Sequence, residues 1–230
     1  MKILITNDDG INAEGLKILV DKAKKYGEVL VVAPSVEQSA KSHCIEIRRG
    51  INVSKTNTFE GVESYSLDST PADCVRFATY GLKYDYDILF SGINNGYNLG
   101  DDILYSGTVG AAMEAALCNK KALAFSTKHN DFSGAIEYFD MAMEYIIKNK
   151  LLEKHNLYNI NIPLVAKDVR MTRQGDTHFN TKFELDENQY YQRGEPHFEL
   201  ELDKKESDIC AILENEISIT PLTTDRTKYF

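Results

Sequence analysis

The chain has 230 residues, of which 43% are hydrophobic and 27% charged, and its formal net charge at pH 7 is −9. This composition is typical of a globular protein with a substantial core and excludes collagen, coiled-coil and disordered chains. No apolar run approaches the roughly 20 residues that span a bilayer, and the acidic balance argues against a basic face for duplex nucleic acid. We therefore expect a soluble cytoplasmic protein with no membrane partner and no duplex nucleic-acid partner.

Apolar strands alternate with amphipathic helices through the first 150 residues. Strands are predicted at residues 2–6, 29–33, 87–90 and 122–126, where short apolar runs are typical of strands buried on both faces. Helices are predicted at residues 16–23, 70–80, 108–118 and 135–148. Thr70 is a predicted N-cap, because Pro71 and Asp73 follow it in the first turn. The alternation predicts an α/β fold with a mostly parallel sheet and helices on both faces.

The last third of the chain changes character. Residues 177–202 alternate short polar and apolar stretches, which predicts an extended hairpin. A hairpin with few apolar residues does not stabilise itself, so we expect it to dock on a neighbouring subunit. Residues 44–48 and 51–55 alternate like a β-ribbon around Gly50, and further strands are predicted at residues 159–162, 169–172, 210–213 and 217–222.

Three polar loops follow predicted strands, at residues 7–10, 34–43 and 91–108. Ligands of open α/β sheets bind outside the carboxyl ends of the strands, where these loops lie. Asp8 and Asp9 are adjacent carboxylates that repel each other, and a cation keeps both ionised. Oxygen ligands favour Mg²⁺, Mn²⁺ or Ca²⁺ over zinc. The alternative is that the pair only caps the next helix or forms an Asx turn.

The third loop supplies amide oxygens and leads into an alanine-rich helix. Three asparagines and three glycines lie in residues 91–100. Ser106, Gly107 and Thr108 then stand at the predicted helix start, where free N–H groups and the macrodipole attract anions. Simple N-capping by Ser106 or Thr108 is the alternative interpretation.

Six short sequences, in this order, resemble the survival protein SurE family over nearly the whole chain. They are residues 7–10 (NDDG), 31–34 (VVAP) with Ser39, 70–75 (TPADCV), 91–102 (SGINNGYNLGDD), 105–109 (YSGTV) and 218–222 (SITPL). The resemblance implies a Rossmann-like three-layer α/β/α core, residues 1–170, and an oligomerisation hairpin with a swapped C-terminal arm, residues 171–230, in one domain. It also implies one divalent metal cation and removal of 5′- or 3′-phosphate from nucleoside monophosphates by a homodimer or homotetramer.

The family's site residues can be transferred to matching positions of this chain. The implied metal ligands are Asp8, Asp9, Ser39 and Asn94, with Asn95 as the alternative to Asn94. The implied phosphate-binding residues are Ser106, Gly107 and Thr108, and Asn98 is expected to line the same pocket. Lys41 and His43 stand near Ser39, where relatives often have arginine and glycine.

The hypothesis for the reaction is in-line attack on the phosphoryl group by a water that the metal activates. Asp8 and Asp9 act in it as catalytic metal ligands, and a covalent aspartate is the less favoured alternative. His43 is a candidate general acid, although a loop histidine more often has no such role. The alternative function is a noncatalytic metal- or nucleotide-binding module, such as a phospho-receiver. That module needs a separate aspartate at the end of a strand, whereas Asp87 begins one.

Overall fold

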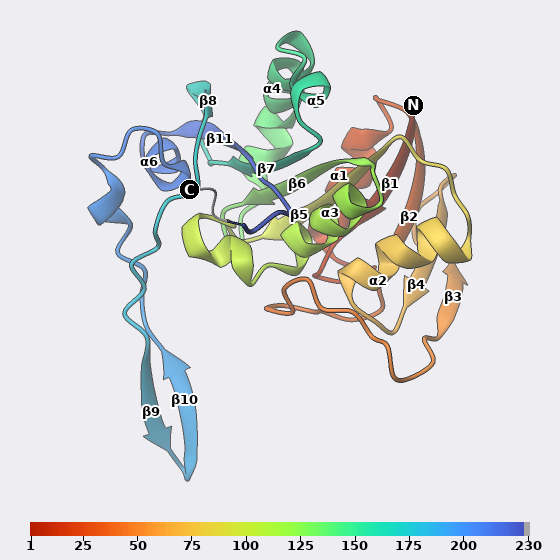
Figure 1. The fold of residues 1–230 in the computed structure, drawn as a ribbon, viewed down its shortest axis with the longest axis horizontal. Coiled ribbons are helices and arrows are strands. Elements are labelled where there is room, and N and C mark those ends of the chain that lie inside the picture. Colours follow the sequence, from red (N-terminus) through yellow and green to blue (C-terminus); the bar gives the residue numbers. More distant parts are fainter. Residues whose placement is uncertain (228–230) are drawn as a thin grey trace.

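The computed structural model describes residues 1–227, and within them a nine-stranded sheet forms the centre of the molecule (Figure 1). The strand order is β3-β4-β2-β1-β5-β6-β7-β11-β8. All neighbouring strands are parallel except the β3–β4 and β7–β11 pairs. The strands are β1 (Lys2–Thr6), β2 (Glu28–Pro34), β3 (Val53–Thr56), β4 (Glu63–Leu67), β5 (Ile88–Asn95), β6 (Lys121–Thr127), β7 (Leu157–Ile162), β8 (Asp168–Met171) and β11 (Glu216–Pro221). The predicted mostly parallel sheet is confirmed.

Helices cover both faces of this sheet. On one face, α1 (Glu14–Ala23), α4 (Ser133–Lys148) and the short α5 (Leu151–Lys154) bury apolar side chains against the sheet. On the other face, α2 (Pro71–Arg76) and α3 (Gly107–Leu117) form a second apolar cluster with it. These two cores make the three layers that the alternation of strands and helices predicts.

The helix predicted to begin after Thr70 does so. Thr70 Oγ1 accepts a hydrogen bond from the Asp73 backbone N–H at 3.1 Å, with Pro71 at the first turn. The helix continues into a π-helical turn, Phe77–Gly81, so its predicted end near residue 80 is also confirmed. A side-chain cap and a proline at the first position are local signals, which is why the sequence alone locates this helix.

Two predicted strands are wrong. Residues 44–48 do not pair with residues 51–55, because they bond to the start of α2: Thr70 Oγ1 donates to the Cys44 carbonyl, and the Glu46 N–H donates to Asp73 Oδ2. Strand β3 pairs instead with β4, which we did not predict. Residues 210–213 lie in α6 (Asp208–Leu213), capped by Ser207 Oγ, which accepts from the Cys210 N–H.

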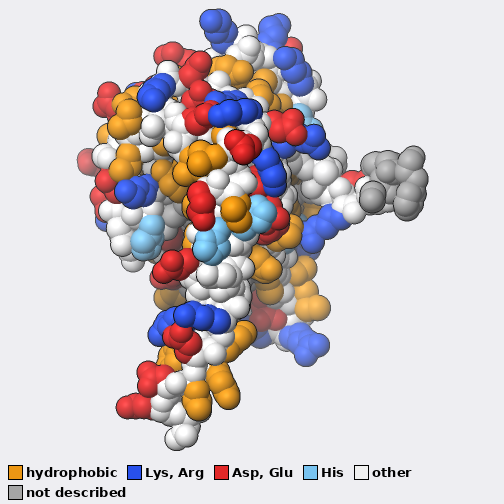
Figure 2. Space-filling model, turned by 90° about the vertical axis from the view of Figure 1, so that its left-hand side faces the viewer, with side chains coloured by type: hydrophobic (Ala, Val, Ile, Leu, Met, Phe, Trp, Pro, Cys, Tyr) orange, Lys and Arg blue, Asp and Glu red, His pale blue; other side chains and the backbone are white. Residues whose placement is uncertain are grey.

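The predicted hairpin is formed by β9 (Lys182–Asp186) and β10 (Gln189–Arg193), which project away from the sheet (Figure 1). Every residue of both strands is exposed. Apolar side chains lie along the hairpin in the space-filling view (Figure 2). In contrast, β8 and β11 of the same C-terminal region complete the central sheet.

Strand β11 pairs with β7 of its own chain, and Leu222 continues this contact by donating its N–H to the Leu157 carbonyl. Exchange of a C-terminal arm between subunits stays a prediction, and residues 228–230 of that arm lie outside the described residues. No helix in residues 1–227 has both the length and the apolar character to cross a membrane.

Candidate active site

The order of the strands creates a crevice at the carboxyl ends of β1 and β5. After β1 the chain builds outward through β2 and β4, and it then returns to place β5 on the opposite side of β1. Such a reversal of strand order is where open α/β sheets bind their ligands. The loop after β1 carries Asp8 and Asp9, and Asn94 and Asn95 are the last two residues of β5. These residues therefore lie at the edge of the sheet where the sequence predicted the site.

A tight turn after β1 presents the two acids. Asn7 stabilises the turn through its side chain, which donates to the Gly10 carbonyl at 3.0 Å and accepts from the Gly10 N–H at 3.2 Å. Gly10 has a φ of +98°, a conformation that glycine adopts without strain. The side chain that makes this turn is Asn7, and not Asp8 or Asp9 as in the alternative interpretation, and α1 has no side-chain cap.

Asp8 is bound to the first turn of α3. Its Oδ1 accepts from the Thr108 hydroxyl at 2.5 Å, and its Oδ2 accepts from the Thr108 N–H at 3.2 Å. A Cβ on Gly107 would lie only 2.9 Å from the Asp8 Cβ, so glycine is needed for this close approach. The structure thus brings Asp8, Gly107 and Thr108 together, although they are 100 residues apart in sequence.

Asn94 and Asn95 approach the acids in different ways. The Asn95 backbone N–H donates to Asp9 Oδ2 at 3.2 Å, while its side chain is hydrogen-bonded to Asn130. The Asn94 carbonyl oxygen, Oδ1, lies 3.5 Å from the Thr108 hydroxyl that also binds Asp8. Only Asn94 therefore directs its side-chain oxygen towards the Asp8–Thr108 contact, which favours it over Asn95 as a ligand.

Burial raises the pKa of both acids. Burial, together with the charge of Asp9, raises the pKa of Asp8 to about 6, against the opposing hydrogen bonds from Thr108. Burial and the charge of Glu37 raise the pKa of Asp9, whereas the Asn95 N–H and His129 oppose this. No lysine or arginine among residues 1–227 forms an ion pair with either carboxylate.

This donor set fits a hard divalent cation. Two crowded, poorly solvated carboxylates and an amide oxygen share one crevice, and a cation there would compensate the charge that no side chain neutralises. The described residues contain no group of three or more His, Cys, Asp or Glu side chains suited to a metal, so any ligand set here must include neutral oxygens.

Ser39 lies in the loop after β2, and its hydroxyl is bound to a neighbouring acid. Its side chain is exposed, and its hydroxyl donates to Glu37 Oε1 at 2.6 Å. The adjacent Gln38 is nevertheless fixed beside the acids, because its N–H donates to the Asp8 carbonyl at 2.7 Å. A role for Ser39 as a ligand stays a prediction that requires its side chain to rotate.

The residues of the predicted anion site lie at the start of α3. Ser106 is the N-cap, and its Oγ accepts from the Val109 N–H at 3.1 Å, so the capping alternative is also correct. The Thr108 N–H is used by Asp8, and the Gly107 N–H has no acceptor among residues 1–227. The Gly107 N–H and the Ser106 hydroxyl hydrogen are thus left to bind an anion.

Asn98 is hydrogen-bonded inside the protein, and its expected place in the phosphate pocket stays a prediction. It is buried, and its Nδ2 donates to Ser126 Oγ at 2.8 Å. Its backbone is bound by Asn159 and Asn161 of β7. Asn159 and Asn161 were not among the predicted site residues. The available signal was a pair of asparagines, two residues apart, within a strand that is otherwise apolar.

His43 packs against α3 but is bound to a buried acid. A Cβ on Gly110 would meet the Ser42 carbonyl at 2.5 Å, which shows how closely this loop crosses the helix. The His43 ring contacts Glu114 Oε2 at 2.8 Å, and Arg76 contacts the other Glu114 oxygen at 2.8 Å. A role for His43 as a general acid stays a prediction.

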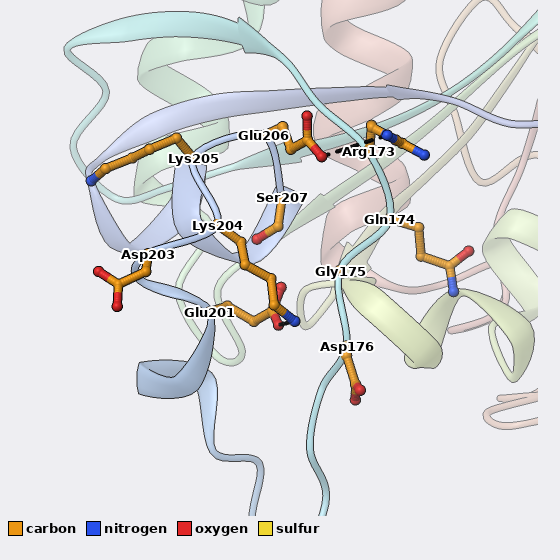
Figure 3. Close-up of a pocket in the computed structure, with 10 residues that line it drawn as sticks. All are labelled: Arg173, Gln174, Gly175, Asp176, Glu201, Asp203, Lys204, Lys205, Glu206 and Ser207. Atoms are coloured by element: carbon orange, nitrogen blue, oxygen red, sulfur yellow. Dashed lines mark hydrogen bonds and ion pairs between the residues drawn. The ribbon is translucent and has the colours of Figure 1, made fainter.

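Two cavities differ in their relation to these residues. One, of about 340 Å³, adjoins Asp9 and is lined by Glu14, Glu37, Asn95 and Phe132, among others. Another, of about 620 Å³, lies at the base of the hairpin and contains the ion pairs Arg173–Glu206 and Lys204–Glu201 (Figure 3). None of the predicted site residues lines this second cavity, so it is separate from the candidate active site.

A phospho-receiver does not fit the structure. Asp87 directly precedes β5, and its carboxylate accepts from the Lys2 N–H at the start of β1. It therefore lies at the amino ends of the strands, opposite the crevice that holds Asp8 and Asp9. Asp87 is therefore not positioned to accept a phosphoryl group beside the acid pair.

Comparisons with known proteins agree with this geometry. The family model for "Survival protein SurE" matches residues 3–181. The protein named 5′-nucleotidase SurE from Alkaliphilus metalliredigens (strain QYMF) is 39% identical, over 100% of this chain and 95% of the relative. The protein of the same name from Clostridium botulinum (strain Alaska E43 / Type E3) is 36% identical, over 100% of this chain and 96% of its own length. The crystal structure of the SurE protein from Aquifex aeolicus has a TM-score of 0.81 and 31% identity, covering 100% of this chain and 96% of that one. The chain belongs to the survival protein SurE family.

Proposed function

We propose that this protein is a phosphomonoesterase that removes phosphate from nucleoside monophosphates, that is, a 5′-nucleotidase. The observation that carries the proposal is the contact of the buried Asp8 carboxylate with the first turn of α3. This contact supports the proposal because it joins an acid that would bind a cation to a helix start that would bind an anion, and phosphoryl transfer requires both. The names of the SurE relatives support the same activity.

Asp8, Asp9 and Asn94 would hold one divalent cation, Mg²⁺, Mn²⁺ or Ca²⁺, and Ser39 would join them after its hydroxyl leaves Glu37. When bound, the cation supplies positive charge beside the phosphoryl group and polarises a water molecule for attack. Thr108 holds Asp8 in a single orientation through two hydrogen bonds, so the carboxylate is ordered before substrate arrives.

The start of α3 would bind the phosphoryl oxygens. The Gly107 N–H and the Ser106 O–H lie at the end of a helix whose own backbone contributes a positive potential there. These donors are fixed by the helix and need no reorganisation as charge develops on the oxygens. His43 would protonate the leaving group only if its ring left Glu114. Asn98 would line the phosphate pocket beside Ser106, Gly107 and Thr108.

The hairpin would join two subunits. Phe183, Leu185 and Tyr190 share one face of it and are 64%, 61% and 70% exposed. Three large apolar side chains on one face of a projecting hairpin are unfavourably exposed to water in a monomer. Contact with the hairpin or the core of a second copy would bury them. We therefore propose a homodimer or homotetramer, in the cytoplasm, with residues 171–230 supplying these contacts and residues 1–170 supplying catalysis.

Phosphate release from AMP, from a 3′-nucleotide and from a chromogenic monoester tests the activity, with and without added Mn²⁺ or Mg²⁺. We expect metal-dependent release from nucleoside monophosphates. Binding of nucleotide or metal without release of phosphate under any of these conditions would instead indicate the alternative function, a noncatalytic binding module.

A further inference from the structure

Two asparagines are buried side by side in the middle of the molecule. Asn159 and Asn161 of β7 are both fully buried. The residues that alternate with them, Tyr158, Ile160 and Ile162, face the apolar cluster beneath α1 and α4. Alternation along a strand therefore directs both amides to the opposite face, where α3 packs. A buried amide is retained only when it is hydrogen-bonded, so its partners indicate what it does.

The partner of both amides is the backbone of Asn98. Asn161 Oδ1 accepts from the Asn98 N–H at 2.9 Å, and Asn161 Nδ2 donates to the Asn98 carbonyl at 3.0 Å. Asn159 Nδ2 donates to the same carbonyl at 2.8 Å, so both lone pairs of that oxygen are used. Asn161 thus binds the N–H and the carbonyl of one residue, as a neighbouring strand would.

The segment that contains Asn98 has little structure of its own. It lies between β5 and the 3₁₀ helix Gly100–Leu104, and Gly96 and Gly100 have φ values of +139° and +52°. Glycine at such positions permits the path of the chain but leaves it flexible. The same segment connects Asn94, beside the acid pair, to Ser106 at the start of α3. Its position therefore controls how the two halves of the candidate active site face each other.

We propose that Asn161 is a positioning residue for phosphoryl transfer: by binding both backbone groups of Asn98, it fixes the loop that sets Asn94 and the start of α3 relative to Asp8. The inference rests on the proposed function, since it names a residue that acts through this loop on the same site. Asn159 contributes less, because it provides one hydrogen bond and its Oδ1 has no partner in the part of the chain that the structure describes.

The two asparagines provide a matched comparison. Asn161→Leu removes two hydrogen bonds to Asn98, whereas Asn159→Leu removes one and also eliminates an unpaired acceptor. We expect Asn161→Leu to lower kcat for AMP about tenfold or more, and Asn159→Leu about threefold or less. Both are measured well below the melting temperature of each variant. Thr172→Val is the control for a structural loss, because Thr172 makes two buried hydrogen bonds, to Ser218 and Thr220, away from this loop.

A second measurement does not depend on catalysis. Hydrogen exchange followed by mass spectrometry should be faster in the peptide covering residues 94–106 of Asn161→Leu than in the original protein. Exchange in residues 81–93 should not change. If Asn161→Leu does not fold, Asn161→Ala replaces it: this smaller apolar side chain also removes both hydrogen bonds to Asn98, and we expect the same loss of kcat and the same faster exchange.

Equal kcat losses in Asn161→Leu and Asn159→Leu, or an unchanged kcat in Asn161→Leu, would overturn the inference. Unchanged exchange in residues 94–106 would overturn it as well, even if the activity fell. Failure of the proposed function is a separate result: the original protein would then release no phosphate from AMP, while the exchange experiment would still report whether Asn161 fixes the loop.

Discussion

The crevice at β1 and β5 and the hairpin of β9 and β10 use polar and apolar residues in opposite ways. In the crevice, polar side chains such as Asp8 and Thr108 are buried and bound to each other. On the hairpin, apolar side chains such as Phe183 and Leu185 are exposed. The crevice is held by a rigid sheet and helix, whereas the hairpin has only its own two strands.

The difference indicates where each region obtains its stability. Buried polar groups are tolerated in the crevice because the surrounding backbone supplies their hydrogen bonds. A two-stranded hairpin is at best marginally stable in water by itself. Its exposed apolar face therefore indicates that it contacts another protein surface. We expect substitutions that change only a few atoms of the crevice to alter activity. We expect the hairpin to act through self-association, which depends on protein concentration.

The largest effect is expected from Asp8→Asn. Turnover of AMP at saturating metal should fall roughly 100-fold or more, because the amide removes charge at the point where cation and phosphate meet. The fold should persist, since a neutral side chain suits this buried position. Asp21→Asn is the control, because Asp21 is an exposed acid on α1. Full activity of Asp8→Asn at saturating metal would disprove its role as a ligand.

Gly107→Ala tests the close approach of α3 to Asp8. The added Cβ would lie 2.9 Å from the Asp8 Cβ and 3.0 Å from its Oδ2, so the carboxylate or the helix must move. We expect a loss of about 1–3 kcal/mol in the free energy of unfolding and a fall in kcat of roughly tenfold or more. Gly50→Ala is the control, because nothing lies within 4 Å of a Cβ there. Equal kinetics for the two variants would show that this contact is unimportant.

Deleting residues 182–193 tests the hairpin. Lys182 and Arg193 are paired opposite each other, so residues 181 and 194 can be joined without disturbing the core. Self-association should weaken about tenfold or more, as sedimentation equilibrium would show, while the far-UV circular dichroism of the core remains. Leu185→Ser should give a smaller shift in the same direction. An oligomer that sediments unchanged after the deletion would contradict the proposed interface.

The smallest effect concerns the ion pairs that attach α6 to the sheet. Hydrogen bonds from Lys205 and Arg170 lower the pKa of Glu214 from its ordinary value of 4.5 to about 2. A lowered pKa means that the stabilisation is present above pH 4.5 and is lost as the pH falls towards 2. Glu214→Gln should therefore lower the melting temperature slightly at pH 7, and the difference should shrink below pH 4.5. Glu153→Gln, at an exposed ion pair, is the control. A constant difference from pH 7 to pH 3 would contradict this explanation.

The sequence predicted those parts of the fold that depend on local signals. The cap at Thr70 and the apolar strands of the parallel sheet are examples, and both are confirmed. Residues 210–213 were assigned wrongly because four apolar residues fit a strand or a helix equally well. The cap at Ser207 decides between them, and we did not recognise it. Residues 44–48 bond to the start of α2, and no local pattern reveals so distant a partner.

For the site, the sequence by itself determined the acid pair after β1, the amide-rich loop after β5 and the capped start of α3. These are properties of short segments, and parallel strands necessarily bring such segments to one edge of the sheet. Only the tertiary structure decided that Thr108 binds Asp8, that Ser39 faces Glu37, and that Asn161 holds Asn98. Each of these three contacts depends on packing or on a side-chain rotamer, and none of them is encoded in the spacing of residues along the chain.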